Sequence, residues 1–207
     1  MHRNLHDALL FFYKFLRMPM QIGSITPSSA SLAKKMIEYV PWQQATAIAE
    51  LGAGSGAITQ YIASAKSKHT QVLLFEKDVE LRQKLTERYP GFPSYPDASR
   101  LDTALRQQGL EDEKLDCILS GLPFFNFPQQ LRDILMEQIS TALKPGGLFI
   151  AFQYSQQMRK QLHQQFEIEH VHFVPLNMPP AFVYVCRKKP PLLHSDSHPL
   201  AEGAACK

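Results

Sequence analysis

The sequence predicts an α/β fold built on a mostly parallel sheet. From residue 45 onward, short apolar runs alternate with stretches that have the roughly 3.6-residue periodicity of amphipathic helices. This alternation is typical of βαβ units, whose strands form a parallel sheet. A glycine-rich turn follows the first apolar run, and the last two runs lie close together without a long helix between them. That final pair is expected to form an antiparallel pair at the end of the sheet.

The apolar runs give the candidate strands, and the stretches between them give the candidate helices. The strands are expected at 46–51, 71–76, 91–96, 115–120, 147–153, 166–174 and 181–187. Helices are expected at 56–66, 78–88, 99–108, 128–143 and 155–165. A further helix is expected ahead of the sheet, over residues 28–39, because Pro41 ends the helical pattern.

Composition places the chain among ordinary globular proteins. Its 207 residues are 44% hydrophobic and 20% charged, which excludes a collagen-like chain, a coiled coil and wholesale disorder. The formal net charge of +3 is too small to indicate the basic stripe of a nucleic-acid-binding protein. Three widely spaced cysteines, Cys117, Cys186 and Cys206, favour neither a disulfide framework nor a metal site. We therefore expect a reduced, cytoplasmic compartment and no bound metal.

The domain organisation is expected to have three parts. Residues 45–187 form the main domain, residues 1–44 a helical extension, and residues 188–207 a disordered tail without periodicity. The first forty residues carry five basic and two acidic side chains. Residues 3–17 read as a cationic amphipathic helix, too short to span a bilayer, which needs about 20 apolar residues. It is expected to be a lid on the domain, a contact with a membrane surface, or both.

A glycine-rich turn is the strongest signal for a ligand. The segment from Glu50 to Gly56 reads Glu-Leu-Gly-Ala-Gly-Ser-Gly, and a helix is expected directly after it. Glycines let a ligand approach the backbone, and a helix N-terminus favours negatively charged groups. Glu76 ends the second strand, where a carboxylate can accept hydrogen bonds from both hydroxyls of a ribose. The turn alone also fits a dinucleotide fingerprint, or a tight turn without any ligand.

Two further acids, Glu50 and Asp97, help to decide between these possible ligands. Glu50 stands where a dinucleotide would place its pyrophosphate, and a carboxylate there would repel it. The same carboxylate favours a ligand that carries an ammonium and a sulfonium. Asp97, after the third strand and before Ala98, can accept a hydrogen bond from an adenine amino group. Alternatively, Asp97 is the N-cap of the next helix.

These residues resemble the class I S-adenosylmethionine-dependent methyltransferases. The glycine turn is similar to their first motif, Glu76 to their ribose-binding acid, and Asp97-Ala98 to their adenine-binding pair. The resemblance covers about residues 45–187 and implies a Rossmann-like, seven-stranded sheet whose last strand is antiparallel. It also implies S-adenosyl-L-methionine as cofactor and S-adenosyl-L-homocysteine as product. The implied cofactor-binding residues are Glu50, Gly52, Ala53, Gly54, Gly56, Glu76, Lys77, Asp97, Ala98 and Ser120.

A second motif, Ser120-Gly-Leu-Pro-Phe-Phe-Asn-Phe-Pro128, follows the fourth strand. Backbone carbonyls exposed there can orient an amine, and aromatic faces can stabilise the cation that develops on its nitrogen during methyl transfer. The alternative is a hydrophobic loop that covers the sheet edge. The motif resembles the Asn-Leu-Pro-Tyr loop of the ribosomal RNA adenine dimethylases, but Gly121 replaces the asparagine that would grip an adenine.

The longer string is more similar to the bacterial soluble-type phospholipid N-methyltransferases, which methylate phosphatidylethanolamine. Two other stretches, 23–29 and 177–184, also resemble loops of that family. The resemblance implies catalytic roles for Gly121, Leu122, Pro123 and Phe124, and substrate contacts for Tyr13, Arg17, Phe125 and Tyr154. His172 is a candidate acceptor of the amine proton, although a lone histidine in a strand is more often structural.

Three functions remain open from the sequence. The favoured one is a phosphatidylethanolamine N-methyltransferase that is peripherally associated with a membrane through residues 1–18. The second is an RNA adenine N6-methyltransferase or a small-molecule amine methyltransferase. The third is a non-catalytic Rossmann-like binding module.

Overall fold

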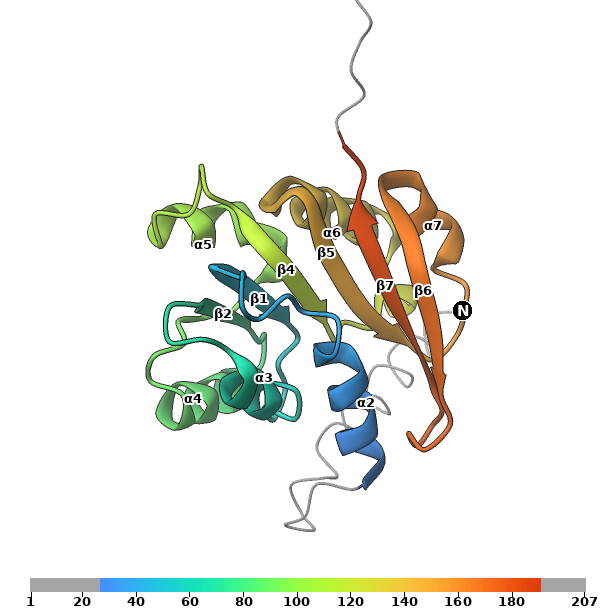
Figure 1. The fold of residues 1–207 in the computed structure, drawn as a ribbon, viewed down its shortest axis with the longest axis horizontal. Helices are drawn as coiled ribbons and strands as arrows, with labels where there is room; N and C mark the ends of the chain where they lie inside the picture. The colour runs from blue at the N-terminus through green and yellow to red at the C-terminus, as the bar shows by residue number, and fades with distance from the viewer. Residues whose placement is uncertain (1–26, 191–207) are drawn as a thin grey trace, which may run out of the picture.

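A seven-stranded sheet forms the centre of the chain, in the order β3-β2-β1-β4-β5-β7-β6 (Figure 1). The computed structural model describes residues 27–190. Strand β7 is antiparallel to both of its neighbours, β5 and β6, and every other neighbouring pair is parallel. The predicted sheet, including the antiparallel pair at its end, is therefore confirmed.

The elements follow the predicted alternation closely. The strands are β1 (Ala47–Leu51), β2 (Gln71–Phe75), β3 (Ser94–Tyr95), β4 (Leu115–Ser120), β5 (Leu143–Gln153), β6 (Phe166–Val174) and β7 (Ala181–Lys188). The α-helices are α2 (Pro27–Ile37), α3 (Thr59–Ala65), α4 (Val79–Arg88), α5 (Leu101–Gln107), α6 (Gln129–Ala142) and α7 (Arg159–Gln165). Two short 3₁₀ helices, η1 (Ala98–Arg100) and η2 (Phe124–Asn126), lie in loops.

Several boundaries differ from the predictions: β5 begins at 143 and not at 147, α7 begins at 159 and not at 155, and three further differences have local reasons. Strand β3 has only two residues, because Pro93 and Pro96 flank it and lack the N–H that a strand ladder needs. Helix α3 begins at Thr59 and not at 56, because the glycine turn extends further than expected. The tail is predicted to begin at Lys188, but this residue pairs with Phe166 as the last residue of β7. The predicted helix at 3–17 and the tail from 191 onward lie outside the described residues.

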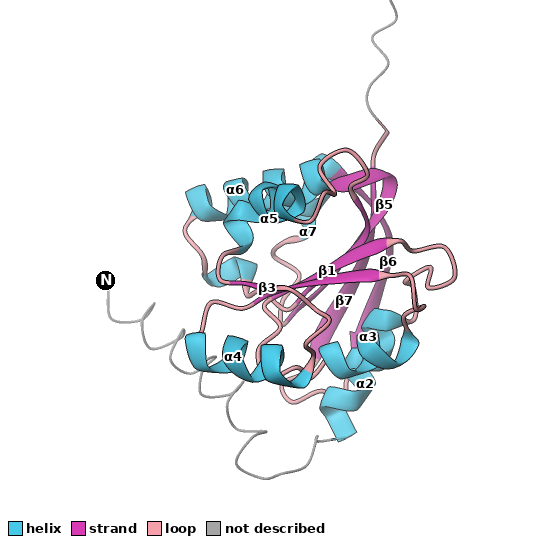
Figure 2. Cartoon of the chain, turned by 90° about the vertical axis from the view of Figure 1, so that its left-hand side faces the viewer, coloured by secondary structure: helices cyan, strands magenta, loops and turns pink. Residues whose placement is uncertain are grey.

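Helices cover both faces of the sheet and bury its central strands, while β6 at the edge stays partly exposed. Figure 2 shows α5, α6 and α7 on one side and α2, α3 and α4 on the other. All five residues of β1 are buried, with Ala47, Ala49 and Leu51 packing into one core and Ile48 into the other. Such two-sided burial explains why the parallel strands read as continuous apolar runs. Within residues 27–190, no helix combines the length and the hydrophobicity that a membrane span requires.

The strand order places a crevice at the carboxyl ends of β1 and β4. Consecutive strands run outward from β1 in one direction and from β4 in the other, so their loops diverge at this point. Ligands of open α/β sheets bind at such switch points. The two loops also contact each other, because the Gly121 N–H donates to the Leu51 carbonyl over 2.9 Å. Both sequence motifs therefore meet at one place.

Candidate active site

The glycine turn and Glu76 form one hydrogen-bonded unit. Gly52, Gly54 and Gly56 all have positive φ, at 74°, 57° and 86°. This conformation turns the Gly54 N–H toward Glu76, whose Oε2 accepts it at 2.7 Å. Glu76 Oε1 accepts from the Asp78 N–H at 2.8 Å. The carboxylate is thus fixed in place, and each oxygen keeps a lone pair for a further donor such as a ribose hydroxyl.

A cavity of about 620 Å³ opens beside this unit. Five of the predicted cofactor-binding residues line it: Gly52, Glu76, Lys77, Asp97 and Ala98. The rest of the lining was not predicted to bind the cofactor, although Leu122 was predicted to be catalytic; it consists of Phe75, Pro96, Ser99, Arg100, Leu122, Phe127, Leu131 and Leu135. Leu131 and Leu135 belong to α6, and their four-residue spacing only indicates a helix face packed on the core.

Asp97 caps the following helix, as one of the two interpretations predicts, while its contact with an adenine stays a prediction. Its Oδ1 accepts from the Ser99 N–H at 2.9 Å and from the Ser99 hydroxyl at 2.7 Å, so it caps η1. The residue also lines the cavity. These hydrogen bonds hold the Asp97 side chain in place. Within the described residues, both of them go to Oδ1.

Five other predicted cofactor residues do not line the cavity but shape the loops around it. They are Glu50, Ala53, Gly54, Gly56 and Ser120. The Ser120 hydroxyl accepts the Leu122 N–H at 3.2 Å and fixes the start of the second motif. The Ala53 N–H donates to the Phe75 carbonyl at 3.0 Å and ties the glycine turn to β2.

Glu50 is a buried carboxylate under the glycine turn, only 1% exposed. Thr59 donates to its Oε2 at 2.7 Å, while Oε1 has no hydrogen-bond partner within the described part of the chain. Burial raises the pKa of Glu50 to about 8, with a smaller contribution from the nearby charge of Glu76 and against the lowering effect of the Thr59 hydrogen bond. A cation bound nearby would favour the ionised form.

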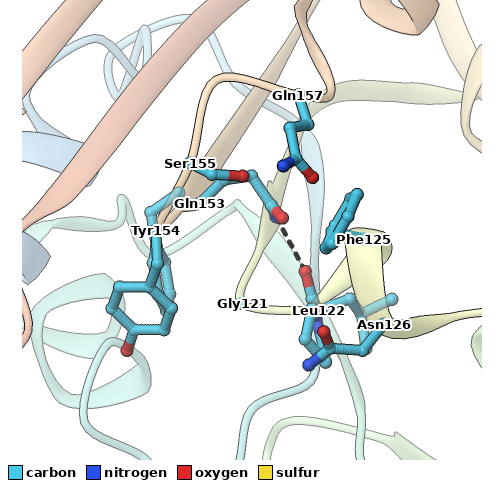
Figure 3. A pocket seen from close by; sticks show the side chains of 10 residues that line it. Gly121, Leu122, Phe125, Asn126, Gln153, Tyr154, Ser155 and Gln157 are labelled. Carbon is cyan, nitrogen blue, oxygen red and sulfur yellow. Dashed lines mark hydrogen bonds between the residues drawn. The ribbon is translucent and has the colours of Figure 1, made fainter. Parts of the chain in front are cut away.

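A second, smaller pocket of about 210 Å³ lies on the other side of the second motif (Figure 3). Of the predicted catalytic and substrate residues, Gly121, Leu122, Pro123, Phe125 and Tyr154 line it. The remaining lining residues are Asn126, Phe152, Gln153, Ser155 and Gln157. None of the lining residues carries a formal charge at neutral pH, so the pocket offers aromatic faces and uncharged polar groups.

Leu122 borders both cavities and therefore separates them. Figure 3 shows Gln153 pointing at Leu122, where its Nε2 donates to the Leu122 carbonyl at 2.9 Å. A Cβ placed on Gly121 would come within 3.2 Å of the Gly52 carbonyl oxygen. The two motifs are therefore packed closely enough that their backbones form the common wall between the cavities.

The structure corrects the expectation for Phe124. Its ring is 1% exposed and packs edge-on against Phe127 and Phe149, with ring centroids 6.3 and 6.1 Å apart. It does not line the pocket, so it cannot present an aromatic face to an acceptor there. Phe125, 51% exposed, does so in its place. The sequence could not distinguish them, because the direction of each ring depends on the 3₁₀ turn of η2.

His172 has the structural role, not the catalytic one. Its Nε2 lies 2.6 Å from the Tyr39 hydroxyl, and the two rings stack at 5.2 Å. Burial and the nearby charge of Lys35 lower its pKa, and it does not line the smaller pocket. Tyr13 and Arg17, the other predicted substrate contacts, lie outside the described residues.

Comparison with known proteins assigns the family. A family model described as a methyltransferase domain matches residues 49–151. An ornithine lipid N-methyltransferase of Singulisphaera acidiphila is 33% identical over 187 residues, covering 87% of this chain and 96% of its own length. The chain belongs to the S-adenosylmethionine-dependent methyltransferases. This membership confirms the predicted cofactor.

Solved methyltransferases share the fold at low sequence identity. The N-methyltransferase NodS of Bradyrhizobium japonicum, solved with S-adenosylhomocysteine, superposes with a TM-score of 0.67 at 11% identity, covering 85% of this chain and 97% of NodS. The 1,6-didemethyltoxoflavin-N1-methyltransferase of Burkholderia thailandensis gives 0.65 at 13% identity, covering 89% and 90%. Likeness at this identity supports the methyltransferase fold alone.

The residues of the larger cavity fit S-adenosylmethionine. Glu76 has free lone pairs for a ribose, Asp97 is held at the rim for an adenine, and Leu131 and Leu135 offer an apolar wall. A Cβ on Gly54 would meet nothing within 4 Å, so this glycine leaves open space. When bound, the cofactor supplies a sulfonium methyl group that a nucleophile displaces directly.

Gly52→Ala is predicted to weaken S-adenosylhomocysteine binding about tenfold or more in calorimetry. Its φ of 74° strains any other residue, and the added Cβ would lie 3.0 Å from a Leu122 methyl group, which must then move into a cavity. Gly146→Ala is the matched control, because it has the same φ of 74° but no neighbour within 4 Å of the added Cβ. Both variants should lose about 1 kcal/mol of stability. Equal binding by the two variants would contradict the shared-wall role of Leu122.

Glu50→Gln is predicted to change the pH dependence of stability. Because the folded-state pKa is raised to about 8, the folded protein keeps a proton that the unfolded chain releases near pH 4.5, so wild-type stability falls as pH rises between these values. The unfolding free energy of the variant relative to wild type should grow by roughly 3–5 kcal/mol across this window. Urea unfolding of the two proteins at several pH values measures this difference. A pH-independent difference would show that Glu50 is not protonated in the folded protein.

Proposed function

We propose that this methyltransferase transfers methyl groups to the primary amine of a membrane lipid headgroup. The observation that carries the proposal is the match to an enzyme named as a lipid N-methyltransferase over 87% of the chain. This match extends well beyond residues 49–151, the part common to methyltransferase domains in general. It therefore includes segments outside the cofactor-binding core.

The smaller pocket has the chemistry that an amine acceptor needs. Attack on a sulfonium methyl requires a neutral amine with its lone pair aimed at the methyl carbon. A pocket whose lining carries no charge favours the neutral amine over the ammonium form. The aromatic rings of Phe125, Phe152 and Tyr154 then stabilise the positive charge that develops on nitrogen.

Backbone carbonyls orient the amine in this proposal. The Leu122 carbonyl already accepts hydrogen bonds from the Gln153 side chain and from the Phe124 N–H, both at 2.9 Å, so its two lone pairs are used. The carbonyl offered to an amine N–H in this proposal is that of Gly121, which also lines the pocket. Gln153 is buried in β5, so it holds the motif at a fixed position between the two cavities. Tyr154 is no general base, because burial raises the pKa of its phenol to about 12. The amine is expected to lose its proton to solvent before transfer, and no covalent enzyme intermediate is involved.

Phosphatidylethanolamine is the first candidate acceptor and an ornithine lipid is the second. The motif of residues 120–128 supports the former, and the name of the relative supports the latter. Both lipids offer a primary amine. In the proposed complex, residues 1–18 bring the enzyme to the membrane. The candidate partners for a headgroup phosphate are Arg17, Lys34, Lys35 and Arg132. An RNA acceptor is disfavoured by the low net charge of +3.

The test uses labelled cofactor with vesicles of phosphatidylethanolamine, vesicles of ornithine lipid, RNA and soluble amines in parallel. We expect label in the lipid fraction and none in RNA. Phe125→Ala should lower lipid turnover about tenfold without changing S-adenosylhomocysteine affinity, since it loses the cation–π contact only. Ile134→Ala is the control, because Ile134 is similarly exposed, at 47%, but does not line the pocket. Label confined to RNA or soluble amines would refute the proposal.

A further inference from the structure

The turn between β6 and β7 exposes an unusual group of apolar side chains. Phe173, Leu176 and Met178 are 57%, 72% and 73% exposed. In the described part of the chain, six large hydrophobic side chains are exposed, and these three lie within residues 173–178, the hairpin tip. Single exposed apolar residues are ordinary, but a cluster of them marks an interaction surface.

The hairpin tip also lacks the groups that resist transfer out of water. Residues 171–186 contain no Asp, Glu, Lys or Arg. Prolines at 175, 179 and 180 remove three backbone N–H donors from the turn. Asn177 supplies internal partners, because its N–H donates to the Val174 carbonyl at 3.3 Å and its side chain to the Pro179 carbonyl at 2.7 Å. Entering a medium of low polarity therefore leaves few polar groups unpaired.

The tip lies at the same end of the sheet as the acceptor pocket. In the strand register, Gln153 of the pocket is paired with Phe182, which is paired in turn with Phe173. The turn is also linked to the pocket directly, since the Asn177 side chain hydrogen-bonds Tyr154. Any surface that binds the hairpin tip would therefore bring the smaller pocket close to that surface.

A basic helix accompanies the tip. Figure 1 shows α2 at the same end of the molecule as the β6–β7 turn, and the Tyr39–His172 contact joins the chain after α2 to β6. The last turn of α2 carries Lys34 and Lys35, of which Lys35 pairs with Glu38 at 2.6 Å. Lys34 is exposed and adds a positive charge that suits anionic headgroups.

We propose that the hairpin tip inserts into the interface of a lipid bilayer and holds the acceptor pocket at the membrane surface. The headgroup amine then reaches Gln153 and Tyr154 while the acyl chains stay in the bilayer. This inference rests on the proposed lipid acceptor, which gives the pocket a reason to approach a membrane. An uncharged apolar tip beside a lysine suits a bilayer, which presents hydrocarbon below a charged surface. A second copy of the chain, or residues 1–26, would be the competing occupants.

The first test places a fluorescent reporter at the tip. Leu176→Trp is mixed with vesicles of equal parts phosphatidylcholine and phosphatidylglycerol, in about 0.5 M salt so that surface charge attraction is screened. The added emission should shift to the blue and be quenched by brominated lipid. Val79→Trp is the matched control, because Val79 is 67% exposed at the start of α4 and should stay in water. Trp42 is present in both variants and cancels from the comparison.

The second test removes the apolar contact. The double variant Leu176→Ser, Met178→Ser should bind the same vesicles at least about tenfold more weakly than wild type, while Val79→Ser should not. S-adenosylhomocysteine affinity should be unchanged in both variants, which shows that they fold. Wild-type vesicle binding by the double variant would overturn the inference. A blue shift of Leu176→Trp without lipid would also overturn it, since the tip would then be covered by protein.

These measurements separate the inference from the proposed function. Vesicle binding is measured without cofactor, so it does not depend on turnover. Should the tip insert while no lipid takes up label, the proposed acceptor is wrong and the membrane contact stands. Should lipid be methylated while the double variant binds and turns over like wild type, the inference alone is wrong.

Discussion

The hydrogen bond from the Gly54 N–H to Glu76 is the interaction on which the active site depends. Its 2.7 Å length joins the loop after β1 to the end of β2, and it requires the positive φ of the glycine turn. Without it, the Glu76 carboxylate, which we propose binds the cofactor ribose, would lose one of the two backbone donors that fix its direction. One backbone donor thus helps to fix the direction in which Glu76 faces the cavity.

The strand order then brings two loops together that lie some seventy residues apart in sequence. Leu51 and Gly121 are in contact because β1 and β4 are neighbours in the sheet. Their boundary is the point at which the strand order changes direction. Leu122 lies between the two cavities as a result. In the proposed function the methyl group and the amine lie on opposite sides of Leu122, so small shifts of the second motif should affect turnover more than cofactor affinity.

The fold was largely predictable because its signals are local. Periodicity identified strand and helix positions, and the glycines and acids identified the cofactor cavity, because each residue type has a specific physical role there. Even the shortness of β3 had a signal, in Pro93 and Pro96. What failed required three-dimensional information. Which of Phe124 and Phe125 faces the pocket, the placement of Leu131 and Leu135 in the cavity wall, and the role of Gln153 all depend on how separate elements pack.

The central claim, that Glu76 is a preoriented acceptor for the cofactor ribose, is tested most directly by calorimetric titration of Glu76→Ala with S-adenosylhomocysteine. The loss of two hydrogen bonds to a charged acceptor predicts about hundredfold weaker binding or more, with an intermediate loss for Glu76→Gln. Glu87→Ala, an exposed acid on α4, should bind like wild type. A folded Glu76→Ala protein that binds with wild-type affinity would contradict the account.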